Sequence, residues 1–341
     1  MPNHNDYPLK LPGSGLGLYT SHSEYKMHIL ITGGAGFIGQ LVAAELLNDA
    51  SHTVILADVV EPKIPRNVKF PANATTMQAD LCTDTGSVVT KDVDAVFVFH
   101  GIMSSGSEAN HELGMRVNVD ATRVLLDEIK LRCPGIRVIY ASSQAVYGQP
   151  LPKLVDDTVI PTPESSYGAE KLICETIVND YSRRGYIDGL ALRFPTISVR
   201  PGLPTAAASS FLSGMIREPM NSQECEIPIA DMNFESWLSS PKTLVWNLIH
   251  SLTLSTEKLP KHIRQINIPG RCATVKDMMD ALEIVGGKDK LAFLKVNEDP
   301  NLVPILKSWP TRFDNRQAYG LGFKGDVSFE QAVRDYVEAL A

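Results

Sequence analysis

The chain has 341 residues, 44% of them hydrophobic and 21% charged, which suits one large α/β domain with a smaller one appended. Its formal net charge of −7 argues against nucleic acid or an anionic membrane as the main partner, and no apolar run approaches membrane-spanning length. The five cysteines are scattered without a Cys-x-x-Cys pair, so we expect a reducing compartment, the cytoplasm, and neither a disulfide framework nor a metal site.

The first 26 residues are polar, contain Pro, Gly and Ser, and lack the apolar core of a secretion signal. We interpret residues 1–26 as a flexible extension ahead of the fold. A nucleotide-binding domain is expected over residues 27–200. Residues 201–341 are more broken in pattern and predict a smaller substrate-binding lobe whose last part returns to the main domain.

A glycine-rich turn organises the first domain. Residues 28–32 form a short apolar run, and residues 40–47 carry apolar side chains at helical spacing. Between them, Gly33 permits the sharp exit from the strand, Gly36 lets a pyrophosphate approach the backbone, and Gly39 lets the helix pack closely on the strand. The turn therefore predicts a dinucleotide site.

The second apolar run, residues 53–57, ends at Asp58. A carboxylate at this point suits the two ribose hydroxyls of adenosine and repels a 2′-phosphate. The sequence thus favours NAD over NADP. Asp80 and Leu81 follow the third strand, and this pair is expected near the adenine ring.

Strands and helices alternate as far as residue 194, with further strands predicted over residues 94–99, 136–141 and 189–194. This order predicts a doubly wound parallel sheet of the Rossmann type, whose ligand crevice lies beyond the carboxyl ends of the strands. A long helix is expected over residues 108–132, with Asn118 on or beside its apolar face. A polar amide there needs a partner, either an internal one or the cofactor.

Tyr167 and Lys171 stand four residues apart in a predicted helix, so both project from one face. A phenol that acts as a base near neutral pH must lower its pKa by roughly three units. The lysine ammonium and a positive nicotinamide ring supply charge of the right sign. Tyr167 would then take the proton of an alcohol while hydride passes to NAD, and Lys171 would also hold the nicotinamide ribose.

These motifs together resemble the extended short-chain dehydrogenase/reductase superfamily, also called the NAD-dependent epimerase/dehydratase superfamily. The matching segments are TGGAGFIG at residues 32–39, SSQAVYG at residues 142–148, SYGAEK at residues 166–171 and RFPTI at residues 193–197. The resemblance selects Ser143, four residues before the tyrosine of Val-Tyr-Gly, as the serine that polarises the substrate oxygen. Ser142 is then expected to be a structural hydrogen-bonding residue.

By the same resemblance, Ser143, Tyr167 and Lys171 are the catalytic residues. Asn118 would anchor main chain or water around the lysine, and His100 would lie beside the cofactor or be structural. The cofactor set it implies is Gly33, Gly36, Phe37, Ile38, Gly39, Asp58, Asp80, Leu81, His100, Asn118, Tyr167, Lys171 and Pro195.

Residues 179–189, 193–219 and 308–333 look like the D-erythronate dehydrogenase branch of the superfamily. That resemblance implies oxidation of the C2 hydroxyl of D-erythronate, a four-carbon sugar acid, to the 2-oxo acid with NAD. Between Arg200 and Lys242 the only basic residue is Arg217, which suits a small monoanion better than a nucleotide diphosphate.

We therefore expect Arg217 or Arg200 to pair with the substrate carboxylate, and Ser104, Ser105, Ser143 and Thr196 to contact its hydroxyls or reacting oxygen. Another interpretation is that Arg217 pairs with Glu218 or Glu224 on the surface.

Three other functions remain open: a nucleotide-sugar epimerase or dehydratase, a ketoreductase acting on a larger metabolite, and a non-catalytic NAD sensor. Intact Ser143, Tyr167 and Lys171 argue against the sensor. The superfamily also suggests a homodimer through the helices near Met115 and Tyr167.

Overall fold

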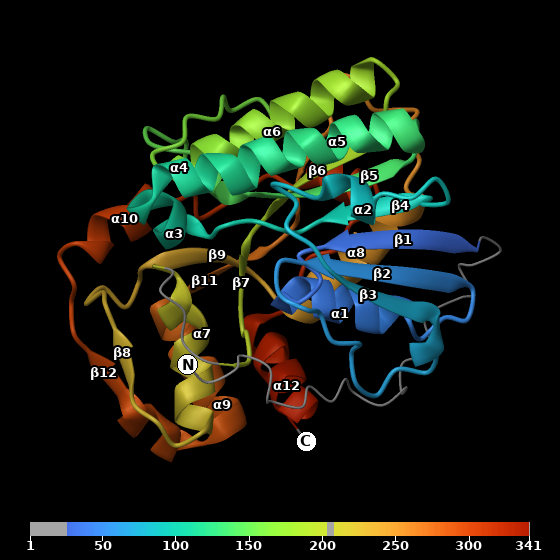
Figure 1. Cartoon of the computed structure of the whole chain (residues 1–341). Coiled ribbons are helices and arrows are strands. Elements are labelled where there is room, and N and C mark those ends of the chain that lie inside the picture. The colour runs from blue at the N-terminus through green and yellow to red at the C-terminus, as the bar shows by residue number, and fades with distance from the viewer. Residues whose placement is uncertain (1–25, 203–207, 341) are drawn as a thin grey trace.

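The computed structural model describes residues 26–202 and 208–340 (Figure 1). The extension expected over residues 1–26 therefore lies outside the described residues, except for Lys26.

A seven-stranded parallel sheet forms the centre of the molecule, with strand order β10-β6-β5-β4-β1-β2-β3. The order reverses between β1 and β4, so the carboxyl ends of these two strands flank the crevice where doubly wound sheets bind ligands. The strands are β1 Met27–Thr32, β2 His52–Asp58, β3 Ala74–Gln78, β4 Ala95–Val98, β5 Arg137–Ser143, β6 Asp188–Phe194 and β10 Gln265–Asn267. The predicted fold class is confirmed.

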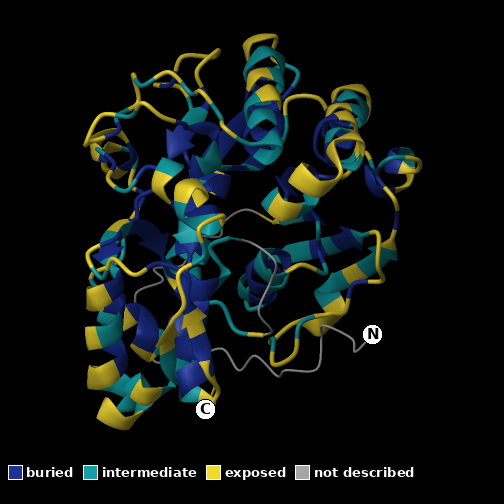
Figure 2. Ribbon diagram, turned by 90° about the vertical axis from the view of Figure 1, so that its left-hand side faces the viewer, coloured by how far each residue is buried: buried dark blue, intermediate teal, exposed yellow. Residues whose placement is uncertain are grey.

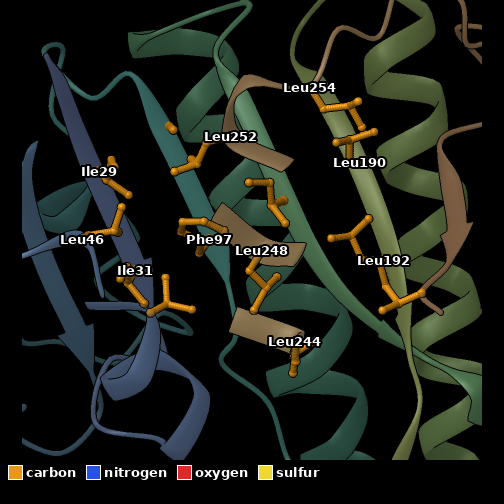
Figure 3. Packing of buried hydrophobic residues seen from close by; sticks show 14 of the residues in the cluster. Ile29, Ile31, Leu46, Phe97, Leu190, Leu192, Leu244, Leu248, Leu252 and Leu254 are labelled. Carbon is orange, nitrogen blue, oxygen red and sulfur yellow. The ribbon is translucent and has the colours of Figure 1, made fainter. Parts of the chain in front are cut away.

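Helices cover both faces of this sheet (Figure 1). On one face lie α1 (Phe37–Leu46) and α8 (Pro241–Thr253), and on the other α2 (Thr85–Val88), α5 (Ala121–Arg132) and α6 (Ser166–Arg183). Figure 3 shows leucines of α8 at helical spacing facing apolar side chains of β1, β4 and β6. Both faces of the strands are apolar because both are covered.

The polypeptide between β4 and α5 differs from the single helix predicted over residues 108–132. It forms α3 (Ser104–Ala109), α4 (His111–Gly114) and a π-helical segment, η2 (Met115–Asp120), before α5 begins. The break falls at Asn110, whose side chain accepts a hydrogen bond from the Leu113 N–H (3.0 Å) and so starts a new helix. The π-helical segment carries Asn118, and such segments occur frequently at functional sites.

The remaining residues form a second, smaller core beside the sheet. Its strands are β7 (Thr196–Ile197), β8 (Cys225–Ile227), β9 (Glu235–Ser239), β11 (Arg271–Thr274) and β12 (Leu294–Val296), which pair as β11-β9-β7 and β12-β8. Its helices are α7 (Ser210–Met220), α9 (Val275–Gly286), α10 (Leu302–Ser308) and α12 (Phe329–Leu340). Helix α11 (Arg316–Gly320) packs through Ala318 on the central core. The 3-10 helices of the described residues are η1 (Pro71–Asn73), η3 (Gln144–Val146) and η4 (Lys288–Phe293). Figure 2 shows that residues on the outer helices alternate between buried and exposed, as one-sided packing requires.

The C-terminal half of the chain contributes to both cores. Helix α8 and strand β10 complete the central sheet and its cover, although both follow residue 201. The division into residues 27–200 and 201–341 thus stays a prediction about domains. The chain crosses between the two cores more than once, so no single boundary separates them.

Candidate active site

The glycine-rich turn brings the carboxyl ends of β1 and β4 into contact. Gly33 has a φ of +69°, and a Cβ there would lie 2.6 Å from the main-chain nitrogen of His100. A Cβ at Gly39 would lie 2.5 Å from the Gly33 carbonyl oxygen, so α1 presses directly on the turn. Gly36 is the N-cap of α1, followed by Phe37 and Ile38. Free backbone N–H groups of the first helical turn therefore lie at the switch point of the sheet, where they suit a pyrophosphate.

The predicted acidic residues lie on the same edge of the sheet. Asp58, at the end of β2, accepts a hydrogen bond of 3.0 Å from the N–H of Ala35 in the turn. Asp80 is exposed just after β3, and Leu81 beside it is buried in the core. Asp58 is therefore tied to the glycine-rich turn, at the place where we expect a ribose-binding carboxylate.

His100 follows β4 and has both ring nitrogens in contact with threonine hydroxyls. The distances are 2.9 Å to Thr32 Oγ1 and 3.2 Å to Thr122 Oγ1. Burial, and then the charge of Lys171, lower the pKa of His100 to about 3. A neutral ring held from both sides is a structural link between β1, β4 and α5, and it is not available as a base.

The three predicted catalytic residues come together at the carboxyl ends of β5 and β4. Ser143 ends β5 and forms a side-chain hydrogen bond with Tyr167, in the first turn of α6. One turn later, Lys171 Nζ donates a 2.8 Å hydrogen bond to the Ala141 carbonyl. The ammonium lies 4.8 Å from the centre of the Tyr140 ring and 5.5 Å from that of Tyr167. Helical spacing and the end of β5 thus produce this cluster.

Burial dominates the electrostatics of the tyrosine and the lysine. Burial, followed by the charge of Glu170, raises the pKa of Tyr167 to about 12, against the opposing effects of Ser143 and Arg200. Burial lowers the pKa of Lys171 to about 8. The expected lowering of the Tyr167 pKa by Lys171 is not found in the protein alone. The Lys171 ammonium is itself desolvated and bonded to the Ala141 carbonyl.

Ser142 and Ser143 point to different partners. Ser142 Oγ donates a 2.5 Å hydrogen bond to Glu175, which also holds Arg193 at 2.8 and 2.6 Å. Arg193 in turn donates to the Tyr147 hydroxyl at 2.7 Å. This buried network braces the ends of β5 and β6 beneath the catalytic cluster, and it occupies Ser142 fully.

The predicted substrate contacts are spread over three segments. Thr196, at the start of β7, accepts a 3.0 Å hydrogen bond from the Gln144 amide, next to Ser143, and Pro195 before it is buried. Ser104 is half-buried and Ser105 exposed on α3. This helix packs against α6 and is fastened there by the Glu108 carboxylate, which accepts the Ser166 N–H at 3.0 Å.

The two candidate arginines have different surroundings. Arg217 is 5% exposed and donates 2.6 Å and 3.0 Å hydrogen bonds to Glu218 and to the Arg200 carbonyl. The alternative that it pairs with Glu218 is therefore right about the partner, but the pair is buried and not on the surface. In the described part of the chain, no carboxylate pairs with the Arg200 guanidinium, although its charge reaches Tyr167.

Three residues near this cluster were not predicted from the sequence. Gln144 supports Thr196 and leaves its carbonyl oxygen without a hydrogen-bond partner in the described structure. Glu170 and Ser107 are 0% exposed and bonded to each other at 2.8 Å. Gln144 lies in the SSQAVYG motif and Glu170 in the SYGAEK motif, and only this position points to them in the sequence. Nothing in the sequence points to Ser107.

The fold and this cluster define an NAD-dependent nucleotide-binding enzyme of the short-chain dehydrogenase/reductase type. The model of the NAD dependent epimerase/dehydratase family matches residues 29–231. The chain belongs to this family and is an NAD-dependent oxidoreductase.

Two curated relatives are similar over almost their whole length. The D-erythronate dehydrogenase of Haemophilus influenzae is 40% identical over 92% of this chain and 99% of its own. The enzyme of the same name from Cupriavidus necator is 38% identical over 92% and 98%. A crystal structure described as a nucleoside-diphosphate-sugar epimerase from Agrobacterium tumefaciens has a TM-score of 0.86 at 34% identity, covering 92% of this chain and 94% of that one. The resemblance inferred from the motifs is confirmed.

Among residues 26–202 and 208–340 there is no helix long and apolar enough to cross a membrane, and no cluster of side chains suited to a metal ion. All five cysteines are unpaired.

Proposed function

We propose that the protein oxidises the C2 hydroxyl of D-erythronate to the 2-oxo acid. The main support is that Ser143 and Tyr167 are hydrogen-bonded beside Lys171 at the carboxyl-end edge of the sheet. The likeness of the whole chain to two D-erythronate dehydrogenases supports the choice of substrate. The reaction removes one hydride from C2 and one proton from its hydroxyl.

Each residue of the cluster has one task. Ser143 holds the substrate oxygen, and Tyr167 accepts its proton. When bound, NAD⁺ supplies the hydride acceptor and a positive charge that favours the tyrosinate. Lys171, held by the Ala141 carbonyl, adds positive charge and holds the ribose hydroxyls. Because the pKa of free Tyr167 is raised to about 12, proton abstraction depends on the cofactor being in place.

The edge formed by the carboxyl ends of β4, β1, β2 and β3 would hold the cofactor. The turn at Gly33 and Gly36 binds the pyrophosphate, with Phe37, Ile38 and Gly39 at the start of the helix. Asp58 accepts the ribose hydroxyls, and Asp80 and Leu81 adjoin the adenine. His100, Asn118 and Pro195 shape the nicotinamide end.

Arg200 is the anchor for the substrate carboxylate. It follows β7, its charge acts on Tyr167, and no described carboxylate neutralises it. Burial, and then the charge of Arg217, lower its pKa, so a bound anion is favoured there. Arg217 is already neutralised by Glu218, and Thr196, Ser104 and Ser105 are left for the hydroxyls.

A nucleotide-sugar epimerase is the second candidate, because the similar Agrobacterium tumefaciens structure carries that description. A diphosphate needs several cationic or amide donors. The substrate lobe offers Arg200, while Arg217 is bonded to Glu218. One available arginine suits a small monoanion better than a diphosphate.

The test is NADH formation, followed by absorbance, on D-erythronate, L-threonate, D-threonate, glycerate and UDP-glucose, each with NAD and NADP. We expect turnover confined to a four-carbon acid with NAD. Tyr167→Phe should abolish turnover while NAD affinity is retained. Silence on every acid, or substantial activity of the Phe variant, would refute the proposal. Tightly copurifying NAD with no net NADH release would favour the epimerase.

The homodimer stays a prediction. Helices α5 and α6 lie side by side on one face of the sheet and carry exposed Leu131 and Ile173 (Figure 1). Light scattering of the wild type and of a Leu131→Glu/Ile173→Glu variant tests whether this surface joins two copies.

A further inference from the structure

Glu170 is a buried carboxylate between Tyr167 and Lys171 in the sequence of α6. Its side chain is 0% exposed. Oxygen Oε2 accepts hydrogen bonds from Asn118 Nδ2 at 2.5 Å and from Ser107 Oγ at 2.8 Å. Oxygen Oε1 has no hydrogen-bond partner in the described structure and faces Gly114, where a Cβ would lie only 2.2 Å away. Burying a carboxylate oxygen without a hydrogen-bond partner costs free energy of folding. This cost suggests that the side chain serves a function.

The carboxylate and the Ile102 main chain together set the orientation of Asn118. An ionised carboxylate only accepts hydrogen bonds, so the Asn118 amide must turn its Nδ2 toward Glu170. The same amide pairs with both main-chain groups of Ile102: Oδ1 accepts from N–H at 2.7 Å, and Nδ2 donates to C=O at 3.0 Å. A flipped amide would lose the bond to Glu170 and both bonds to the Ile102 main chain.

The segment held by Asn118 passes beside the catalytic lysine. Gly101 and Ile102 follow His100 at the end of β4, and a Cβ on Gly101 would lie 2.8 Å from Asn118 Oδ1 and 3.9 Å from Lys171 Nζ. Glu170 therefore reaches, through one amide, the main chain that borders Lys171. The four participating segments are α3, α4, the π-helical segment η2 and α6.

The charge of Glu170 also acts on both members of the pair. For Tyr167, burial and then the charge of Glu170 raise the pKa. For Lys171, burial lowers the pKa, and the charges of Cys174 and then Glu170 oppose this effect. Helices α3 and α4 and segment η2 face Glu170 with Ser107, Gly114 and Asn118, none of which titrates. The other titratable groups acting on the pair are Cys174 and Glu175 of α6, Tyr140 of β5, His100 after β4, and Arg200 after β7.

We propose that Glu170 is a positioning residue of this active site: it holds the Asn118 amide, which contacts the Gly101–Ile102 main chain beside Lys171, and it places a carboxylate next to the Tyr167–Lys171 pair. The inference rests on the proposed roles of that pair. A purely structural network would stabilise the fold without setting the charge state of Lys171.

The charge role is tested without any substrate, using Glu170→Gln, which keeps an acceptor oxygen for Asn118 and Ser107. NMR of the protein labelled with [ε-13C]lysine, with the signal assigned by Lys171→Met, follows the titration of Lys171. We expect the midpoint to fall by about one pH unit in the Gln variant. Ser107→Ala, which removes a donor and keeps the charge, should leave the midpoint in place. Equal midpoints in wild type and Glu170→Gln would overturn the charge role, whatever the true substrate is.

The positioning role is tested by a double-mutant cycle on a substrate that turns over. Glu170→Ala and Asn118→Ala should each lower kcat by about 10- to 100-fold, and the double variant should match the single variants within about twofold. Losses that multiply would show that Glu170 does not act through Asn118. If Glu170→Ala fails to fold, Glu170→Met, which also removes the acceptor oxygens but keeps most of the side-chain volume, replaces it in the cycle, and a kcat within twofold of wild type overturns the positioning role.

Discussion

The guanidinium of Arg217 donates a 3.0 Å hydrogen bond to the main-chain carbonyl of Arg200. The Arg200 N–H donates in turn to Ser213 Oγ at 3.1 Å, so α7 holds the Arg200 backbone on both sides. The Arg217 guanidinium also donates a 2.6 Å hydrogen bond to the Glu218 carboxylate. Arg217 therefore braces the Arg200 backbone, whereas no carboxylate of the described residues pairs with the Arg200 guanidinium, which we propose binds the substrate.

This division predicts different kinetic consequences for the two arginines. Arg200→Met should raise KM for the sugar acid by roughly 10- to 100-fold, because a charge-assisted hydrogen bond to a carboxylate contributes about 1.5–3 kcal/mol. A neutral alcohol substrate should lose much less. Steady-state kinetics on both substrates measure the difference, and equal losses would contradict the carboxylate role.

Asp58 should decide the cofactor. Asp58→Asn keeps an acceptor for the Ala35 N–H, now at 3.0 Å, and removes the charge that repels a 2′-phosphate. We expect the ratio of kcat/KM for NADP to that for NAD to rise at least about tenfold. Asp80→Asn, at the exposed end of β3, is the matched control and should change the ratio little. An unchanged ratio in Asp58→Asn would place the selectivity elsewhere.

Lys171 should lower the free energy of unfolding although turnover requires it. Its pKa is about 8 in the folded protein and 10.5 ordinarily, so the unfolded chain binds more protons between these values. Stability therefore rises as the pH increases from about 8 to 10.5, and below pH 8 the buried ammonium costs about 3 kcal/mol.

Lys171→Met should thus abolish turnover and yet increase the free energy of unfolding at pH 7. The gain should be about 1–2 kcal/mol, because the Ala141 carbonyl is left unpaired. Urea unfolding at pH 7 and 9.5 measures it, with exposed Lys276→Met as control. A gain that does not shrink at the higher pH would contradict this account.

The features that could be predicted from the sequence depend on residues that lie close together in the chain. Tyr167 and Lys171 share a helix face by spacing alone, and Gly33 needs its positive φ because of the turn that contains it. Parallel strands then carry Ser143 and Asp58 to one edge of the sheet. The strand ends that hold the site follow from the alternation of strands and helices.

What could not be predicted depends on contacts between distant segments. Glu170, Asn118 and Ser107 lie on three different elements, and no local pattern shows that they meet. The burial of Arg217 depends on the small lobe closing over α7. The break at Asn110 could not be predicted because it depends on the Asn110 side chain accepting a hydrogen bond from the Leu113 N–H.

His100 predicts sensitivity to acid. Its pKa is about 3 in the folded protein and 6.5 ordinarily, so the unfolded chain binds the extra proton first as the pH falls below 6.5. Stability is lost progressively between about pH 6.5 and 3, by up to about 5 kcal/mol. His100→Gln can bond both Thr32 and Thr122 without titrating, so the difference in unfolding free energy between variant and wild type should grow in the variant's favour as the pH falls from 7 to 4.5. Exposed His262→Gln should follow the wild type. Parallel curves for His100→Gln and wild type would mean that the His100 ring takes up its proton without disturbing the link between β1, β4 and α5.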